Sequence, residues 1–159
     1  DWNTAFRVAA QMPDVAFYMV CPKGIYERFN HKYVNVFLFC DLSVNEFIEI
    51  QKGCSITYLP LDTNAPAGLI VLYQAAALEK LVVISDTPVT RAYISEDRGC
   101  LVELFDSDSV IGKMRFFLDN PGIRKEKSVR LKSFLREFCS EEKYVETIEN
   151  LIEKTAYNK

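Results

Sequence analysis

The stretch Asp62–Asp86, DTNAPAGLIVLYQAAALEKLVVISD, places a polar loop, an alanine-rich apolar segment and a short apolar run in direct succession. Its middle part predicts a helix from about Pro66 to Glu79, because proline suits the first turn of a helix. The run Leu81–Ile84 is apolar at every position, which is typical of a strand buried on both faces of a parallel sheet. Loop, helix and strand in this order indicate one repeat of an α/β fold.

Similar apolar runs recur on both sides of this stretch. They lie at residues 15–20, 34–39, 55–59 and 100–104. Helical segments are expected between them at residues 2–11, from Ser43 with Glu46 completing a capping box, and briefly after Pro88. Strands that alternate with helices pair in parallel through right-handed crossovers. The sequence therefore predicts a doubly wound, Rossmann-like parallel sheet flanked by helices.

The last third of the chain is predicted to be helical. The carboxylates of Asp106 and Asp108 resemble a metal-chelating pair, but their place before a helical pattern favours N-capping. Asn120-Pro121-Gly122 ends that helix, and a further helix is expected over residues 123–138. A final helix opens at Ser140, and its apolar stripe consists of Tyr144, Val145, Ile148, Leu151 and Ile152. We expect this C-terminal tail to form a helical cap on the sheet.

The composition is that of a globular protein of one domain. The chain has 159 residues, 49% of them hydrophobic, and a net charge of −3 at pH 7, which argues against a nucleic-acid-binding domain. No apolar run approaches the length of about 20 residues that spans a bilayer. Neither an initiator Met nor a signal-peptide pattern is found at Asp1, so the chain is interpreted as a fragment, a processed product or a trimmed chain.

The five cysteines are widely spaced and include no CxxC pair, which predicts free thiols rather than disulfides or a zinc site. Cys21, Cys40 and Cys100 lie in or beside apolar runs, where a thiol behaves as a small hydrophobic group. These features favour a reducing compartment, the cytoplasm. With His31 as the only histidine, we expect no metal and no cofactor.

Ligands of an open parallel sheet bind beyond the carboxyl ends of its strands. The sequence contains no GxGxxG, Walker A or GxSxG motif, so dinucleotide, P-loop and hydrolase sites lose their usual support. At the start of the predicted helix, the backbone N–H groups of Ala67, Gly68 and Leu69 suit a phosphate, because glycine permits close approach. From the residues alone, a plain helix start at Pro66–Gly68 is an equally good interpretation.

The order of these features resembles a known family. Arg7–Val15 matches its entry of helix, proline and strand, Leu81–Asp86 matches a later strand, and Phe117–Pro121 followed by Arg124 closes the match. On these residues the chain resembles the C-terminal, donor-binding domain of retaining GT-B glycosyltransferases of the family 4 (group 1) type.

This resemblance extends over about residues 1–135, with the terminal helix, residues 136–159, outside it. It implies that residues 1–159 form a single Rossmann-like domain that binds a nucleotide-sugar. It also implies that the family's first strand and its N-terminal acceptor domain are missing here, together with the basic pair that grips the pyrophosphate.

The family's signature is a pair of glutamates separated by seven residues, and those positions fall on Pro66 and Gln74. The resemblance implies that Gln74 binds the ribose, because an amide both donates and accepts hydrogen bonds. Pro66 cannot replace the carboxylate that lies near the donor sugar. The implied sugar or nucleotide contacts are Asn64, Ala65, Pro66 and Lys23, next to the diphosphate site at Ala67, Gly68 and Leu69. No catalytic residue can be assigned.

The implied reaction transfers a hexose from a nucleoside-diphosphate sugar to a glycan or a lipid-linked acceptor, as in polysaccharide biosynthesis, without a metal. The chain would be half of a hexosyltransferase and inactive alone. A non-catalytic binding or scaffold module of the same fold is the alternative, favoured by the loss of both glutamates. A phosphoacceptor receiver domain fits the size but needs an acidic pair and a lysine that the sequence does not place.

The basic stretch Ile123–Lys132 raises the question of membrane contact, because a basic amphipathic helix can lie on anionic lipid. Glu126 and Glu137 dilute its charge, so a solvated helix face is the favoured interpretation. The expected location is cytoplasmic, with peripheral contact at the inner membrane face as the alternative.

Overall fold

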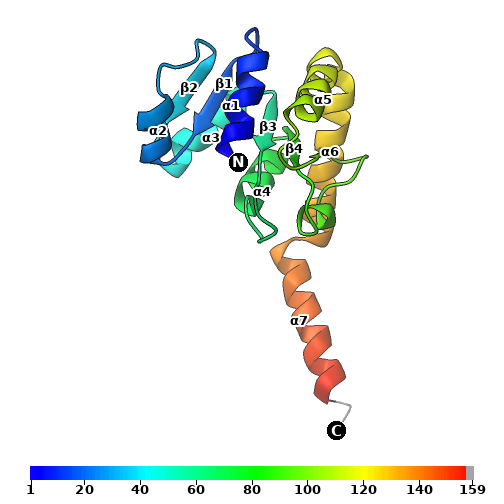
Figure 1. Cartoon of the computed structure of the whole chain (residues 1–159). Coiled ribbons are helices and arrows are strands. Elements are labelled where there is room, and N and C mark those ends of the chain that lie inside the picture. Colours follow the sequence, from blue (N-terminus) through cyan, green and yellow to red (C-terminus); the bar gives the residue numbers. More distant parts are fainter. Residues whose placement is uncertain (157–159) are drawn as a thin grey trace.

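The computed structural model describes residues 1–156 and shows helices packed around short parallel strands (Figure 1). In chain order the elements are α1 (Trp2–Gln11), β1 (Phe17–Val20), α2 (Lys23–Phe29), β2 (Val36–Phe39), α3 (Val44–Gly53), β3 (Ile56–Leu59), α4 (Leu69–Ala77), β4 (Leu81–Ser85), the 3-10 turn η1 (Thr90–Ala92), β5 (Cys100–Val102), α5 (Ser107–Asp119), α6 (Pro121–Phe138) and α7 (Glu141–Ala156). The predicted doubly wound α/β architecture is confirmed.

All strand pairs are parallel, but the strands form two sheets instead of one. β1 pairs with β2, in the register Phe17 to Val36. β4 lies between β3 and β5, in the registers Ile56 to Leu81 and Val83 to Cys100. Among the described strands, none bridges the two sheets. Figure 1 shows them next to each other, with β2 outermost and β1 on the side of β3.

Helix α1 joins the two sheets on one face. Its residues Val8 and Met12 belong to a buried cluster with Leu81 and Val83 of β4. The members of a second buried cluster lie on α1, on β1 and β2, and just after β1: Ala5, Phe6, Ala9, Met19, Cys21 and Leu38. The end of α1 is held by the Asn35 amide, which donates to the carbonyls of Ala9, Met12 and Val15 at 2.9–3.0 Å.

Helices α4 and α6 cover the opposite face of the three-stranded sheet. Leu72 of α4 and Leu131 of α6 are fully buried against Val82 and Ile84 of β4. Every residue of β4 is buried, as the continuous apolar run predicts. This part of the molecule holds the main core.

The predicted helix caps are confirmed. Ser43 and Glu46 form a reciprocal capping box at the start of α3. Asp106, considered above as a metal ligand, caps α5 by accepting from the Ser109 N–H at 2.9 Å. Short polar side chains satisfy the N–H groups that a helix leaves unpaired at its start.

Several predicted boundaries need correction. Lys23 was expected in a loop, but it is the first residue of helix α2, which the sequence pattern missed. The helix expected from Pro66 to Glu79 begins at Leu69 and ends at Ala77. The short helix expected after Pro88 is a single 3-10 turn. The difference in α4 lies at the ends of the helix, where methods of assignment disagree most, whereas α2 and the 3-10 turn are short elements with little hydrophobic periodicity.

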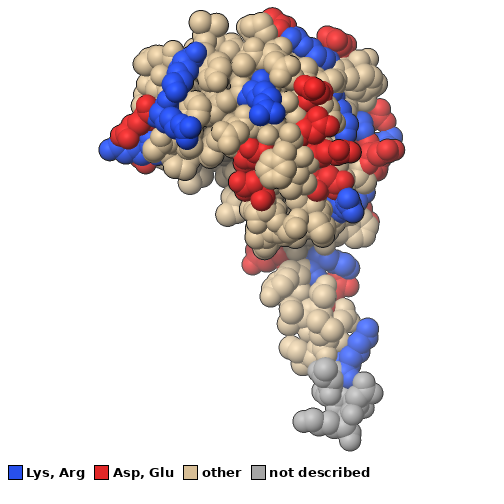
Figure 2. Space-filling view, viewed as in Figure 1, with Lys and Arg blue, Asp and Glu red and all other residues tan. Residues whose placement is uncertain are grey.

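The expectation that the final helix caps the sheet is wrong. Helix α7 extends away from the body of the molecule, as Figures 1 and 2 show. Of its stripe, Tyr144 is 68% exposed and Leu151 is 54% exposed. Both faces of the three-stranded sheet are already covered, by α1 and α5 on one side and by α4 and α6 on the other, so no face remains for α7. Residues 157–159 of the predicted tail lie outside the described part.

The basic stretch on α6 forms ion pairs with acidic neighbours. Lys132 Nζ lies 2.8 Å from Glu79, which Lys125 also pairs, and Arg130 pairs with Glu126. On the face shown in Figure 2, basic and acidic side chains are intermixed. In the described residues, no helix has the length and apolar character that crossing a membrane requires.

Candidate functional site

The carboxyl ends of β3 and β4 are tied together by one side chain. The Ser85 hydroxyl accepts from the Leu61 N–H at 2.8 Å and donates to the Leu61 carbonyl at 3.0 Å. Ser85 is buried. This contact fixes the base of the loop Asp62–Ala67, which leads into α4. The loop thus lies at the sheet edge where ligands of α/β proteins bind.

Gly68 forms the junction between this loop and α4. It has φ +73°, a conformation that other residues adopt only with strain, and a Cβ there would lie 3.4 Å from Leu61 Cδ2. Gly68 is the N-cap of α4, and no side chain caps this helix. The first N–H groups of α4 are therefore available, as at any uncapped helix start. The helix starts at Leu69, three residues later than the Pro66 position expected from the sequence.

Of the predicted diphosphate donors, one already has a partner. The Ala67 N–H donates to the Ala65 carbonyl at 2.7 Å, so it is not free to bind an anion in this conformation. The N–H groups of Gly68 and Leu69 lie at the start of α4 as the phosphate interpretation requires. Asn64, Ala65 and Pro66 are exposed on the loop. The Ala65 N–H donates to the Thr63 hydroxyl at 3.1 Å, which gives the loop a local turn.

Gln74 lies in the second half of α4 and is half-buried. Six residues of α-helix separate it from Gly68, a rise of about 9 Å. Gln74 lies one helical turn after Ile70, which is exposed on the same face of the helix. Lys23, the remaining predicted contact, is exposed at the start of α2, with Glu27 at 3.9 Å. The structure thus brings the loop residues and Gly68 together, and it places Lys23 on another element.

A charged pair that follows β4 was not predicted from the sequence. Arg91 makes two hydrogen bonds to the Asp86 carboxylate, at 2.6 and 3.0 Å. These bonds lower the pKa of Asp86 and raise that of Arg91. Behind the pair, the Thr90 hydroxyl donates to the Ser85 carbonyl at 2.7 Å and holds the turn to Ser85. The acid directly after a strand was visible in the sequence, but its partner depends on the 3-10 turn.

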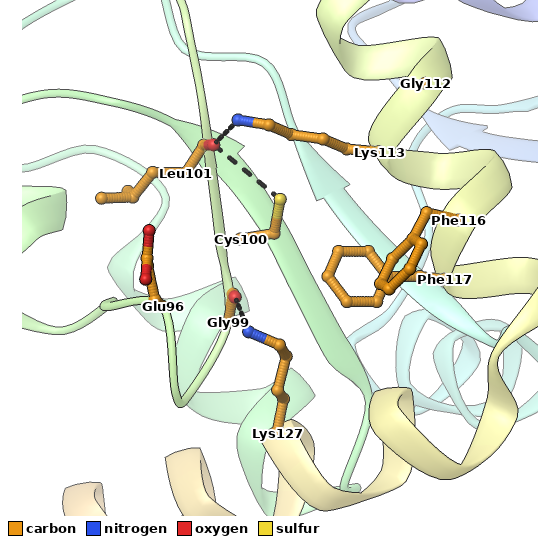
Figure 3. A pocket seen from close by; sticks show the side chains of 9 residues that line it. All are labelled: Glu96, Gly99, Cys100, Leu101, Gly112, Lys113, Phe116, Phe117 and Lys127. Carbon is orange, nitrogen blue, oxygen red and sulfur yellow. Dashed lines mark hydrogen bonds between the residues drawn. The ribbon is translucent and has the colours of Figure 1, made fainter.

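A hollow lies elsewhere, at the outer edge of β5 between α5 and α6 (Figure 3). Its volume is about 520 Å³, and Cys100 lies at its floor. Lys113 and Lys127 reach into it and donate to main-chain carbonyls of Leu101 and Gly99. Burial raises the pKa of the Cys100 thiol. The ammonium groups of Lys113 and Lys127 thus cover the free edge of β5. This hollow lies at the edge of the sheet, apart from the loop before α4.

Within residues 1–156, no cluster of three or more His, Cys, Asp or Glu side chains has the geometry to hold a metal ion. The five cysteines are free, and Cys21 and Cys100 are buried as predicted. The chemistry available beyond the carboxyl ends of β3 and β4 is therefore that of backbone donors, hydroxyls and the Asp86–Arg91 pair.

Several solved structures with the same fold are glycosyltransferases. Sucrose-phosphate synthase from Thermosynechococcus elongatus superimposes with a TM-score of 0.78 at 16% identity, over 98% of this chain and 42% of its own. HepE from Anabaena, in complex with UDP, gives 0.77 at 15% identity, over 99% of this chain and 45% of its own. The catalytic domain of cholesterol-α-glucosyltransferase from Helicobacter pylori gives 0.73 at 17% identity, over 87% and 90% of the two chains.

By sequence, no family model matches the chain, and no curated protein matches it either. The chain spans less than half the length of the sucrose-phosphate synthase and HepE structures. Identities this low establish the fold alone. The chain thus has the Rossmann-like α/β fold that these GT-B glycosyltransferase structures contain.

Proposed function

We propose that the chain is the nucleotide-sugar-binding part of a glycosyltransferase, with the donor diphosphate at the start of α4. The observation that carries this proposal is the uncapped start of α4 at Gly68, placed at the carboxyl edge of the sheet. Support comes from the neighbours of the same fold, since HepE was solved with UDP and with UDP-glucose. The helix dipole and unpaired N–H groups favour a phosphate at such a position.

In this proposal each residue has a limited role. The N–H groups of Gly68 and Leu69 donate to the diphosphate and stabilise the negative charge that grows on it as the sugar leaves. Ala67 joins them only if the loop releases its N–H from Ala65. Gln74 hydrogen-bonds the ribose, and Asn64, Ala65, Pro66 and Lys23 line the approach. No metal is invoked, because backbone donors carry the charge.

The proposed reaction is transfer of a hexose to a glycan or lipid-linked acceptor, in the cytoplasm, by a protein that also contains an acceptor domain. Pro66 supplies no carboxylate at the sugar, so the residues of this chain bind and orient the donor rather than act on it. We expect the chain alone to bind nucleotide without transferring sugar.

Calorimetric titration with UDP, GDP and UDP-glucose tests the proposal. Gly68→Trp places an indole over the helix start and should abolish binding. Gly122→Trp is the matched control, because Gly122 lies in the first turn of α6, with nothing within 4 Å of its added Cβ. Circular dichroism should show both variants folded. Absence of binding by the unmodified chain at millimolar nucleotide would rule the donor site out.

The non-catalytic binding or scaffold module is a second candidate, favoured by Pro66 and Gln74 at the signature positions. The two candidates differ in one measurement. A scaffold of this fold binds none of the three nucleotides, whereas a donor domain binds at least one and loses it in Gly68→Trp.

A further inference from the structure

The hollow at the outer edge of β5 contains two lysine side chains and none of the residues of the proposed donor site (Figure 3). Lys113 reaches it from α5, and Lys127 reaches it from α6. Both side chains are half-buried. Among the ion pairs of residues 1–156, none includes either lysine. Two positive charges thus share one hollow without a carboxylate that neutralises them.

The charges of both lysines act on the same point, the Cys100 thiol at the floor of the hollow. Burial raises the pKa of this thiol, and the positive charges of Lys113 and Lys127 act against the rise. The acidic residue among those that line the hollow is Glu96. It is exposed and lies on the other side of the strand from Cys100 in Figure 3. The side of the hollow above Cys100 therefore favours an anion.

The edge of β5 adds a main-chain donor between the two lysines. Val102 faces β4, since its carbonyl accepts from the Asp86 N–H at 2.7 Å. In a parallel ladder, successive residues direct their N–H and C=O groups to opposite edges of the strand. Those of Leu101 therefore point away from β4, and its carbonyl accepts from Lys113 at 2.6 Å. The Leu101 N–H lies on this same outer edge, beside the hollow.

The spacing of the two ammonium groups suits one shared phosphate. Lys127 donates to the Gly99 carbonyl at 3.5 Å, and Lys113 donates to the Leu101 carbonyl, two residues further along the same edge. With a rise of about 3.3 Å per residue, these carbonyls lie roughly 7 Å apart. Each ammonium group has three donors and uses one for its carbonyl. Because charge-assisted hydrogen bonds are about 2.8 Å long, a tetrahedral anion between the two groups can accept from both.

The wall of the hollow opposite the strand is aromatic. Phe116 and Phe117 of α5 line it, and their rings lie 5.2 Å apart at an angle of 75°. Phe116 is 49% exposed, so another flat ring can pack against it. Gly112, one turn earlier on α5, leaves space, since nothing lies within 4 Å of an added Cβ. The volume of about 520 Å³ is in the range of sites for small organic molecules.

We propose that this hollow binds a phosphomonoester that carries a ring-shaped organic group. Its phosphate lies between Lys113 and Lys127 and accepts from the Leu101 N–H, and its ring packs against Phe116. A phosphomonoester carries nearly two negative charges at pH 7, which match the two ammonium groups. The inference is independent of the proposed function, because the hollow lies along the side of β5 and not at the loop before α4.

Titration of the 159-residue chain with phenyl phosphate, inorganic phosphate and phenol tests the proposal, with calorimetry and amide NMR shifts as readouts. Phenyl phosphate should bind and shift the amides of residues 99–102 and Gly112, whereas those of Gly68 and Leu69 should stay in place. Inorganic phosphate should bind more weakly at the same amides, and phenol should not bind. Absence of binding at millimolar phenyl phosphate would overturn the proposal, as would shifts confined to Gly68 and Leu69 or equal binding of phenol.

Substitution of the lysines tests the role of their charges. Lys113→Gln and Lys127→Gln should each weaken phenyl phosphate binding about tenfold, because a charge-assisted hydrogen bond is lost. Lys132→Gln is the matched control, since Lys132 is also half-buried on α6 but pairs with Glu79. It removes the same charge and should leave the affinity unchanged. An equal loss in all three variants, or no loss in the first two, would contradict the proposed site.

A charge added to the hollow tests the site with both lysines in place. Gly112→Glu puts a carboxylate in the wall and should abolish binding, whereas Gly122→Glu adds the same charge outside the hollow and should not. Phe116→Ala should weaken the binding of phenyl phosphate but not that of inorganic phosphate. Gly68→Trp should leave both unchanged, which separates this site from the proposed donor site. Equal binding by the Gly112→Glu and Gly122→Glu variants, both folded by circular dichroism, would overturn the proposal.

Discussion

The three-stranded sheet and the two-stranded sheet of this protein are packed to very different degrees. β4 is buried at all five positions, between α1 and α5 on one face and α4 and α6 on the other. β1 and β2 each have one buried residue, Met19 and Leu38. Tyr18 is 49% exposed and Phe37 46% exposed, and their rings stack on each other at 5.1 Å. A face of the smaller sheet thus remains open to solvent.

The two sheets should therefore contribute differently to the stability of the protein. Burial of apolar surface is the main favourable term in folding, so the three-stranded part should dominate the free energy of unfolding. The two-stranded part depends on α1 and on the Asn35 hydrogen bonds to stay attached. The proposed donor loop arises from the well-packed part, which holds Gly68 in place.

The largest expected effect is loss of core packing in the three-stranded part. Leu131→Ala should lower the free energy of unfolding by about 2–5 kcal/mol, because the side chain is fully buried and a cavity remains. Leu38→Ala, in the smaller sheet, should cost less, since that site borders solvent and can relax. Urea unfolding of both variants measures the difference. Equal losses would show that the two parts are equally well packed.

A second effect is expected at Gly99, which directly precedes β5 and packs closely against Ile94. In Gly99→Ala the added Cβ would lie 2.8 and 2.9 Å from two Ile94 side-chain atoms, so Ile94 must move. We expect a loss of about 1–3 kcal/mol, as for other overpacked sites. Gly53→Ala is the control, with nothing within 4 Å of the new atom at the end of α3. Thermal unfolding should rank them in this order, and an unchanged Gly99→Ala would contradict the close packing.

A smaller effect is expected from the exposed aromatic pair. Tyr18→Ala should lower the free energy of unfolding by about 0.5–1.5 kcal/mol, the usual contribution of one aromatic contact. Phe37→Ala should give a similar loss, and the double variant should lose less than the sum, because each ring is the other's partner. Additive losses would mean that each ring is stabilised separately by the sheet.

The smallest effect is a pH dependence that arises from Glu79 and Asp14, two carboxylates in turns that pair with basic residues of α6 and α5. Hydrogen bonds from Lys125 and Lys132 lower the pKa of Glu79 from 4.5 to about 2, and Arg115 lowers that of Asp14 from 3.8 to about 2. Because the folded pKa is below the unfolded value, this stabilisation is present above about pH 4.5 and is lost as the pH falls toward 2.

Melting temperature against pH checks this expectation. Glu79→Gln should flatten the curve between about pH 4.5 and 2 while leaving the rest of it unchanged in shape. Asp14→Asn should flatten the same curve over a slightly lower pH range. Both carboxylates are solvent-accessible, so the changes should be modest and should shrink further in high salt. A curve as steep as that of the unmodified chain would exclude Glu79 as a contributor.

The elements with strong local signals were predictable. The run Leu81–Ile84, the capping box at Ser43 and the Asp106 cap all occur where the pattern indicated. Helix α2 was missed because Lys23–Phe29 is short and buries no residue completely, so it carries little hydrophobic periodicity. Of the candidate site, Gly68 as the start of a helix was readable from the sequence. The engagement of the Ala67 N–H and the Asp86–Arg91 pair was not, since both depend on turn geometry.

Local sequence patterns were sufficient to predict the fold class and most of the helix starts. These follow from short-range physics, namely the spacing of apolar residues, the capping of helix ends and the conformational freedom of Gly68. The division of the strands into two sheets and the outward direction of α7 became visible only in the packed molecule. Those outcomes depend on which edges and faces other elements already cover, and a local pattern contains no information about that competition.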